Sequence, residues 1–85
     1  MANMIHLRVE SAAGVLLERD LCYVNIPTAE GSVGVLSNHA PMMCAICPGK
    51  LIYREEGGEN SELTVGYGVA RVEDNKITVL LSADK

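Results

Sequence analysis

The first strong pattern in the chain is an alternation of apolar and polar residues. Ile5, Leu7 and Val9 fall on one side of an extended segment, and the polar residues between them fall on the other. A period of two is typical of a β-strand with one buried and one solvated face. Residues 21–26 repeat the alternation, and Pro27 then lacks the amide that a central strand donates. We therefore expect two strands here, the second ending at Pro27 or lying at a sheet edge.

The rest of the chain divides into short apolar runs separated by turn residues. These runs predict strands over 15–17, 33–36, 42–47, 50–55, 62–65, 69–73 and 76–81. Pro48-Gly49 is a strong turn signal, residues 56–60 predict an acidic hairpin loop, and Asp74-Asn75 predicts a second hairpin. About eight or nine short strands at this spacing predict an all-β fold, an antiparallel β-sandwich or barrel. The length predicts a single domain over residues 1–85.

One core residue and one loop are also expected from the sequence. Val79 lies on the same face of the last predicted strand as its apolar neighbours two residues away, so it is expected in the core. Residues 37–41 are expected to form a loop. Pro41 restricts the residue before it to extended geometry, and Asn38 tolerates left-handed dihedral angles.

Composition and charge exclude several classes of function. The 85 residues carry 11 acidic and 7 basic side chains, a formal net charge of −4, whereas a nucleic-acid binder needs excess Lys and Arg. Apolar residues make up 48% of the chain, which argues for a packed core and against disorder. No apolar run approaches the roughly 18 residues of a membrane span, and the N-terminus lacks the features of a signal peptide. We expect a soluble domain that binds no nucleic acid and inserts into no membrane.

The segment Cys44-Ala45-Ile46-Cys47 has the spacing of a redox pair but not its surroundings. A reactive first thiol needs a helix N-terminus that lowers its pKa, and here an apolar run ends in Pro48-Gly49. Side chains three positions apart in a strand point to opposite faces, so the two sulfurs diverge. A structural zinc site needs four ligands, and Cys22, His6 and His39 are scattered along the chain. We expect packed, inert cysteines and no metal site, and a thiol enzyme that uses Cys44 and Cys47 stays as an alternative.

The other candidates for catalysis or ligand binding lack a complete set of partners. The glycines never form the strand, glycine loop and helix arrangement that holds a phosphate. His39 has Ser37 nearby but no nucleophile elbow and no orienting acid, so we expect it to brace a loop or contact a partner. His6 and the acidic segment 55–62 are expected to be solvated, since the segment lacks the ligand spacing of a calcium loop. No catalytic residue and no cofactor are expected.

A longer pattern beginning at Ile26 is more specific than any of these motifs. Its residues are Ile-Pro-Thr-Ala-Glu-Gly-Ser-Val-Gly-Val-Leu-Ser-Asn-His-Ala-Pro, and a later strand ends in Cys-Pro-Gly-Lys-Leu. The acidic-Gly turn, the His-Ala-Pro segment and the strand ending in Pro-Gly together resemble the epsilon subunit of bacterial F-type ATP synthases. The first strand (4–12) and the last hairpin (69–80) are also similar to that family. The resemblance covers essentially the whole chain.

The resemblance implies a fold and a function. The fold is the family's N-terminal antiparallel β-sandwich of about ten strands. The function is that of a non-catalytic subunit of the central stalk, or rotor, which links the gamma subunit to the c ring. Such a subunit couples proton transport to ATP synthesis and hydrolysis. Its place is peripheral, at the cytoplasmic face of the bacterial plasma membrane within the ATP synthase complex.

Two contact regions are implied residue by residue. The turn Ala29-Glu30-Gly31-Ser32 resembles the family's contact with the polar loops of the c ring, and an acidic turn suits basic or polar loops. The segment near the gamma subunit is matched by His39, Ala40, Pro41 and Met42. Met42 and Met43 add adaptable apolar contact area.

The chain departs from the family pattern in several places. Ser37-Asn38 stands where Pro-Gly is usual, Ser32 where an acidic residue is common, and Tyr67-Gly68 where paired glycines occur. The chain ends at Lys85, without the two-helix C-terminal hairpin that in many bacteria binds ATP and inhibits hydrolysis. We therefore expect neither nucleotide binding nor inhibition by an inserted helix.

A β-sandwich binding module for a small ligand or peptide remains the main alternative. The two hypotheses predict different surfaces. A rotor subunit predicts an apolar patch on the outer face of one sheet, larger than a monomer normally exposes. A binding module predicts a concave pocket with convergent polar groups.

Overall fold

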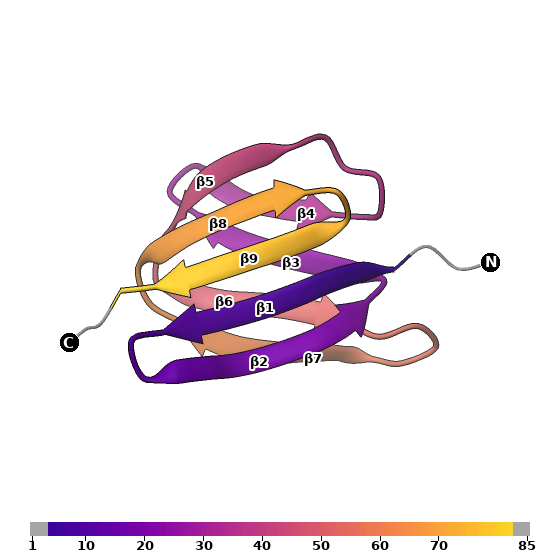
Figure 1. The fold of residues 1–85 in the computed structure, drawn as a ribbon, viewed down its shortest axis with the longest axis horizontal. Helices are drawn as coiled ribbons and strands as arrows, with labels where there is room; N and C mark the ends of the chain where they lie inside the picture. The colour runs from indigo at the N-terminus through magenta and orange to yellow at the C-terminus, as the bar shows by residue number, and fades with distance from the viewer. Residues whose placement is uncertain (1–3, 83–85) are drawn as a thin grey trace.

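Nine β-strands and no helix form within residues 4–82, the range that the computed structural model describes (Figure 1). The strands are β1 (Ile5–Ser11), β2 (Gly14–Leu21), β3 (Tyr23–Thr28), β4 (Gly31–Val35), β5 (Met42–Ile46), β6 (Gly49–Arg54), β7 (Asn60–Val65), β8 (Gly68–Glu73) and β9 (Lys76–Leu81). The predicted all-β fold is therefore confirmed. The two ends of the predicted 1–85 domain, including Lys85, lie outside the described residues.

One continuous sheet connects the strands in the order β2-β1-β9-β8-β5-β3-β6-β7, with β4 paired to β3. The sheet curls over itself, so that a layer of β2, β1, β9, β8 and β5 faces a layer of β4, β3, β6 and β7 (Figure 1). Seven of the described strand pairings are antiparallel, as expected, but β1 and β9 run parallel. The predicted sandwich architecture is therefore correct, but the sheet is not purely antiparallel, because β1 and β9 are parallel.

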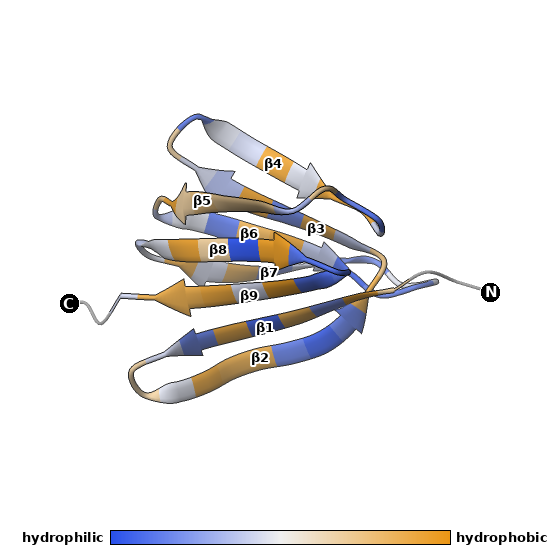
Figure 2. Ribbon diagram, turned by 45° about the horizontal axis from the view of Figure 1, so that its top comes forward, coloured by the Kyte–Doolittle hydropathy of each residue, from blue (hydrophilic) through white to orange (hydrophobic). Residues whose placement is uncertain are grey.

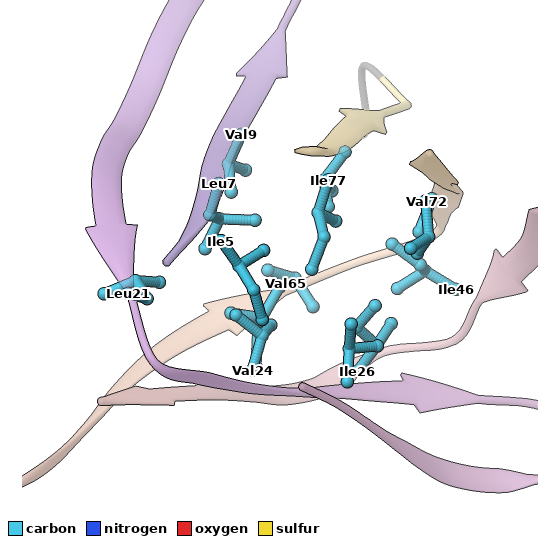
Figure 3. Close-up of a cluster of buried hydrophobic side chains, with 14 residues drawn as sticks. Ile5, Leu7, Val9, Leu21, Val24, Ile26, Ile46, Val65, Val72 and Ile77 are labelled. Carbon is cyan, nitrogen blue, oxygen red and sulfur yellow. The ribbon is translucent and has the colours of Figure 1, made fainter. Parts of the chain in front are cut away.

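The core lies between the two layers and consists of the inward side chains of alternating strand positions (Figure 3). Ile5, Leu7 and Val9 of β1 point inward as predicted, and none is more than 1% exposed. The other buried apolar residues are Leu21, Val24, Ile26, Val35, Ile46, Leu51, Val65, Ala70, Val72, Ile77 and Val79. Burying each larger side chain contributes about 1.5–3 kcal/mol relative to leaving it exposed, so this cluster is the main source of stability.

β3 continues through Pro27, where the sequence predicted an end or an edge, and that prediction is wrong. The nitrogen and carbonyl of one residue point to the same side of a strand, and the Pro27 carbonyl accepts a hydrogen bond of 3.2 Å from the Cys47 amide. On that side the partner of β3 changes from β6, paired as far as Asn25, to β5, paired at Thr28. The Pro27 nitrogen therefore lies where β3 changes partner from β6 to β5.

An ion pair bridges the two ends of the curled sheet. Arg19 lies on the core side of β2, in register with Leu7, yet its side chain is 53% exposed. Its Nε lies 3.8 Å from Oε2 of Glu55, just after β6. An inward-pointing charge at a sheet edge discourages pairing with another chain, so this edge is protected.

Candidate functional site

The β3–β4 turn, one of the two predicted contact regions, lies at one end of the sandwich (Figure 1). Ala29, Glu30, Gly31 and Ser32 are all exposed, and Gly31 has a φ of 111° that favours glycine. The Thr28 hydroxyl holds the turn, since it donates to the Gly31 carbonyl and accepts from the Glu30 amide. The turn therefore presents the Glu30 side chain to solvent from a fixed backbone.

A shallow hollow of about 230 Å³ lies between this turn and β5. Its lining residues are Thr28, Ala29, Glu30, Met43, Cys44 and Ala45. Met43 is 70% exposed, whereas Met42 is half-buried and packs against the core. Of the two methionines expected to add contact area, Met43 is thus the one whose side chain is open to a partner.

The second predicted contact region lies at the opposite end of the sandwich, in the loop between β4 and β5 (Figure 1). The molecule measures 41 × 22 × 20 Å, and the two loops are separated along its longest dimension. Ala40 and Pro41 are exposed and His39 is half-buried. The Nδ1 atom of His39 lies 2.7 Å from the Ala40 carbonyl oxygen, so the imidazole braces its own loop.

Asn38 takes the left-handed conformation expected of it, with a φ of 65°. Its amide donates a hydrogen bond of 2.6 Å to Oδ1 of Asn75 in the β8–β9 turn. Asp74 and Asn75 also have positive φ, 53° and 60°, as a two-residue hairpin turn of the primed type requires. The two segments meet around a hollow of about 370 Å³ lined by Asn38, His39, Pro41, Asp74 and Asn75.

One row of side chains on the outer face of the β2-β1-β9-β8-β5 layer is mostly apolar. Residues in register on neighbouring strands point to the same face. The row consists of Val15, Glu10, Leu80, Val69 and Ala45, which are successive partners across the five strands. Val15, Leu80 and Val69 are 48%, 54% and 42% exposed. We call Val15, Leu80, Val69 and Ala45 the apolar row.

Along β2 the residues change from hydrophobic to hydrophilic toward the end that carries the His39 loop (Figure 2). The rows of the outer face become charged in the same direction. The next row contains Glu18, Arg8, Thr78, Arg71 and Met43, and the one after it Asp20, His6, Lys76 and Glu73. The outer face of the opposite layer carries the exposed Lys50 and Glu62, which form a 3.2 Å ion pair. The exposed side chains of the apolar row therefore lie on the outer face of one layer, with Glu10 between Val15 and Leu80.

His6 lies on the solvated face of β1, as the sequence predicted, and two carboxylates bind its ring there. Its Nδ1 lies 2.8 Å from Oδ1 of Asp20 and its Nε2 lies 2.7 Å from Oε2 of Glu18. Hydrogen bonds to Asp20 and then to Glu18 raise the pKa of the imidazole above its ordinary 6.5. Only the imidazolium form donates from both nitrogens, so this arrangement favours protonated His6.

The cysteines do not resemble an activated thiol pair. Cys22, Cys44 and Cys47 are free and half-buried. Burial raises the pKa of the Cys44 thiol, whereas a thiol nucleophile needs the opposite shift. These environments argue against a thiol enzyme.

Residues 4–82 contain no helix that is long and apolar enough to span a membrane. No group of three or more His, Cys, Asp and Glu side chains in that range is placed to hold a metal ion. The two loop hollows have largely exposed linings, unlike the apolar, enclosing pocket of a small-ligand module.

Comparison with known proteins identifies a family and close relatives. Residues 4–83 match the family model of the ATP synthase, Delta/Epsilon chain, beta-sandwich domain. The ATP synthase epsilon chain of Lawsonia intracellularis is 35% identical over 83 residues, which are 98% of this chain and 62% of that protein. The ATP synthase epsilon chain of Nitratidesulfovibrio vulgaris (strain Miyazaki F) is 38% identical over 80 residues, 94% of this chain and 59% of that protein. The chain thus spans about three-fifths of the length of these curated relatives.

Two solved structures share the fold. A chain in the cryo-EM structure of Euglena gracilis mitochondrial ATP synthase (OSCP/F1/c-ring) has a TM-score of 0.84 and 26% identity, covering 92% of this chain and 50% of that one. A chain in the Tetrahymena thermophila mitochondrial ATP synthase central stalk and c ring has a TM-score of 0.77, covering 93% of this chain and 63% of that one. Its identity is 15%, so this second likeness concerns the fold alone.

Proposed function

The chain belongs to the family of the ATP synthase delta/epsilon β-sandwich domain, and on that premise we propose that it is a non-catalytic subunit of the central stalk of an F-type ATP synthase. In this function it links the gamma subunit to the c ring and transmits rotation between them. Relatives named ATP synthase epsilon chain and a structural neighbour in an assembly with a c ring support the proposal. The proposed place is peripheral, at the cytoplasmic face of the bacterial plasma membrane.

The observation that carries the proposal is the position of the two loops at opposite ends of one sandwich. The turn Ala29-Glu30-Gly31-Ser32 is proposed to meet the c ring, and the segment His39-Ala40-Pro41-Met42 is proposed to meet the gamma subunit. A close-packed core of fully buried side chains separates them. Such cores have low compressibility, so a displacement at one end is transmitted to the other. A coupling subunit needs two docking sites on a stiff body, and two exposed loops at opposite ends of one packed core support this proposal.

We place the gamma subunit against the outer face of the β2-β1-β9-β8-β5 layer. The apolar row gives this face an apolar contact surface, and β5 runs from that row to the His39 loop. The charged rows around His6 and Arg8 would form the rim. An apolar centre with a polar rim is the usual anatomy of a protein interface.

The c-ring contact is assigned to the turn that carries Glu30. The Glu30 carboxylate is exposed on a turn fixed by Thr28, and Met43 beside it offers an adaptable apolar side chain. An acidic group on a fixed backbone suits basic or polar loops, for which it gives orientation and specificity.

The test is complex formation with the gamma subunit of the same organism, followed by size-exclusion chromatography. We expect the folded chain to co-elute with the gamma subunit, and the complex to be retained by c rings in liposomes. His39→Ala should weaken gamma binding severalfold with little loss of folding, because a loop histidine is not a core residue. Glu30→Ala should reduce retention by c rings without changing gamma affinity. A folded chain that forms no complex with the gamma subunit would refute the proposal.

A further inference from the structure

Asn75 joins three segments at the end of the sandwich that carries the His39 loop. Its backbone carbonyl accepts a hydrogen bond of 2.9 Å from the His6 amide at the start of β1. Its side-chain Oδ1 accepts a hydrogen bond of 2.6 Å from the Asn38 amide in the β4–β5 loop. Asn75 itself belongs to the β8–β9 turn, so one residue holds together segments that are far apart in the sequence.

The backbone of the turn limits which residue can make these contacts. Glu73 and Lys76 are register partners, so Asp74 and Asn75 form a two-residue turn in which both have positive φ. Gly, Asn and Asp adopt this conformation most readily. Of these three, only Asn and Asp also carry a side-chain oxygen that can accept a hydrogen bond. Asn75 therefore satisfies the turn and reaches the loop at the same time.

The hydrogen bond from Asn38 to Asn75 ties the β4–β5 loop to another segment of the chain. Residues 37–41 belong to no strand. Of the hydrogen bonds described for these residues, that of Asn38 reaches another segment, whereas the contact between His39 and Ala40 stays within the loop. The left-handed φ of Asn38 is held at the same point, directly before His39.

We propose that Asn75 is a positioning residue whose side chain holds the β4–β5 loop in the conformation in which His39 and Pro41 meet the gamma subunit. The gamma contact rests on the function proposed above, whereas the hold on the loop rests on the hydrogen bond alone. A loop that is already ordered loses less conformational freedom when it binds a partner. If the loop became disordered, gamma affinity would fall even though no contact residue had been removed.

Three variants separate the Asn75 side chain from the turn that carries it. Asn75→Gly removes Oδ1 and adopts positive φ without strain, so the turn is kept. Asn75→Asp keeps an acceptor oxygen on a residue that tolerates the same φ. Asp74→Gly is the matched control, because it removes the neighbouring side chain at the other positive-φ position of the same turn.

The first measurement is amide hydrogen exchange by NMR on the isolated chain. Loss of one hydrogen bond should speed exchange of the Asn38 amide about three- to tenfold in Asn75→Gly. Asn75→Asp and Asp74→Gly should keep the parent rate. An Asn38 amide that exchanges at the parent rate in Asn75→Gly would overturn the hold on the loop.

The second measurement is affinity for the gamma subunit. Asn75→Gly should bind about three- to tenfold more weakly while the domain stays folded, and Asn75→Asp should bind within about twofold of the parent. If Asn75→Gly speeds exchange of the Asn38 amide but binds the gamma subunit as tightly as the parent, Asn75 does not position the gamma contact. If the parent chain itself binds no gamma subunit, the proposed function fails, and the exchange rates alone decide whether Asn75 positions the loop.

Discussion

Val69 on β8 and Leu80 on β9 are direct partners in the antiparallel ladder, and both side chains point away from the core. The next pair along the same two strands, Ala70 and Val79, is fully buried. These strands therefore carry an apolar pair on each face, although one face is open to solvent. Directly opposed side chains on one face lie within contact distance, so Val69 and Leu80 form a continuous apolar surface.

Leu80→Glu is expected to weaken gamma binding at least tenfold while the domain stays folded. The substitution places a carboxylate in the centre of the proposed interface, where burial without a partner is costly. Isothermal titration calorimetry against the gamma subunit measures the change. Thr64→Glu is the matched control, because it adds the same charge to an exposed position of β7 in the opposite layer. Equal affinities of the two variants for the gamma subunit would show that it does not bind this face.

Val79→Asp is expected to unfold the domain. Val79 is 0% exposed and lies in register with Val9 and Ala70, both of which are also fully buried. An unpaired carboxylate in this core costs several kcal/mol, which is about the whole stability of a small domain. Circular dichroism and thermal melting test this, with Leu80→Glu at the next position as the control. A cooperative melt of Val79→Asp near the parent temperature would show that its side chain does not point into the core.

The alternation along β1 and β9 was enough to predict which of their side chains face the core, whereas Leu21 is buried at the end of β2 and not in the strand over 21–26 that the sequence predicted. Ile5, Leu7, Val9 and Val79 lie inward as expected, because the side-chain period of a strand is two and only one face of each is buried. The left-handed conformation of Asn38 was also predictable, since it depends on local sterics.

Pairing between distant segments was not predictable in the same way. The parallel pairing of β1 with β9 and the partner change beside Pro27 depend on which strands meet in the folded sheet. The carboxylates that hold His6 lie 12 and 14 residues away and are brought to it by the β1–β2 register. The bond between Asn38 and Asn75 spans 37 residues. Neither the hydrophobic periodicity nor a local motif predicts these contacts, because their partners lie far apart in the sequence.

The stability of the chain is expected to fall as the pH rises through the range in which His6 loses its proton. The pKa of His6 in the folded state is above 6.5, its ordinary value, because Asp20 and Glu18 bind the protonated ring. The stabilising contribution is therefore complete below about pH 6.5 and is lost as the pH rises through the folded-state pKa. Partial burial of the ring opposes the shift. The basic groups Arg8, Lys76 and Arg71 lie on the same face.

Urea unfolding at about pH 6 and about pH 9 measures this loss, and His6→Gln is the control that lacks the titrating group. The His6 side chain is 41% exposed, so solvent screening keeps the difference between parent and variant below about 1 kcal/mol. An NMR titration of the imidazole gives the pKa directly. A His6 pKa at or below 6.5 would show that the two carboxylates do not hold the ring in solution.

Gly68→Ala is expected to destabilise the domain, whereas Gly66→Ala should be tolerated. A Cβ on Gly68 would collide with the carbonyl oxygen of Leu80 and lie 3.0 Å from the Cα of Leu81, which are backbone atoms of β9 that cannot move aside. A Cβ on Gly66 would meet nothing within 4 Å. Forced displacement of β9 should cost about 1–3 kcal/mol, the range for overpacked sites.

The same geometry accounts for a large side chain at Tyr67 directly before Gly68. Tyr67 is 66% exposed, so its side chain needs no space in the sheet, and only Gly68 lies against the next strand. Denaturant unfolding of both variants, compared with the parent, measures the difference. Equal stability of Gly68→Ala and Gly66→Ala would mean that β8 and β9 separate at this end, where Val69 and Leu80 form the proposed docking surface.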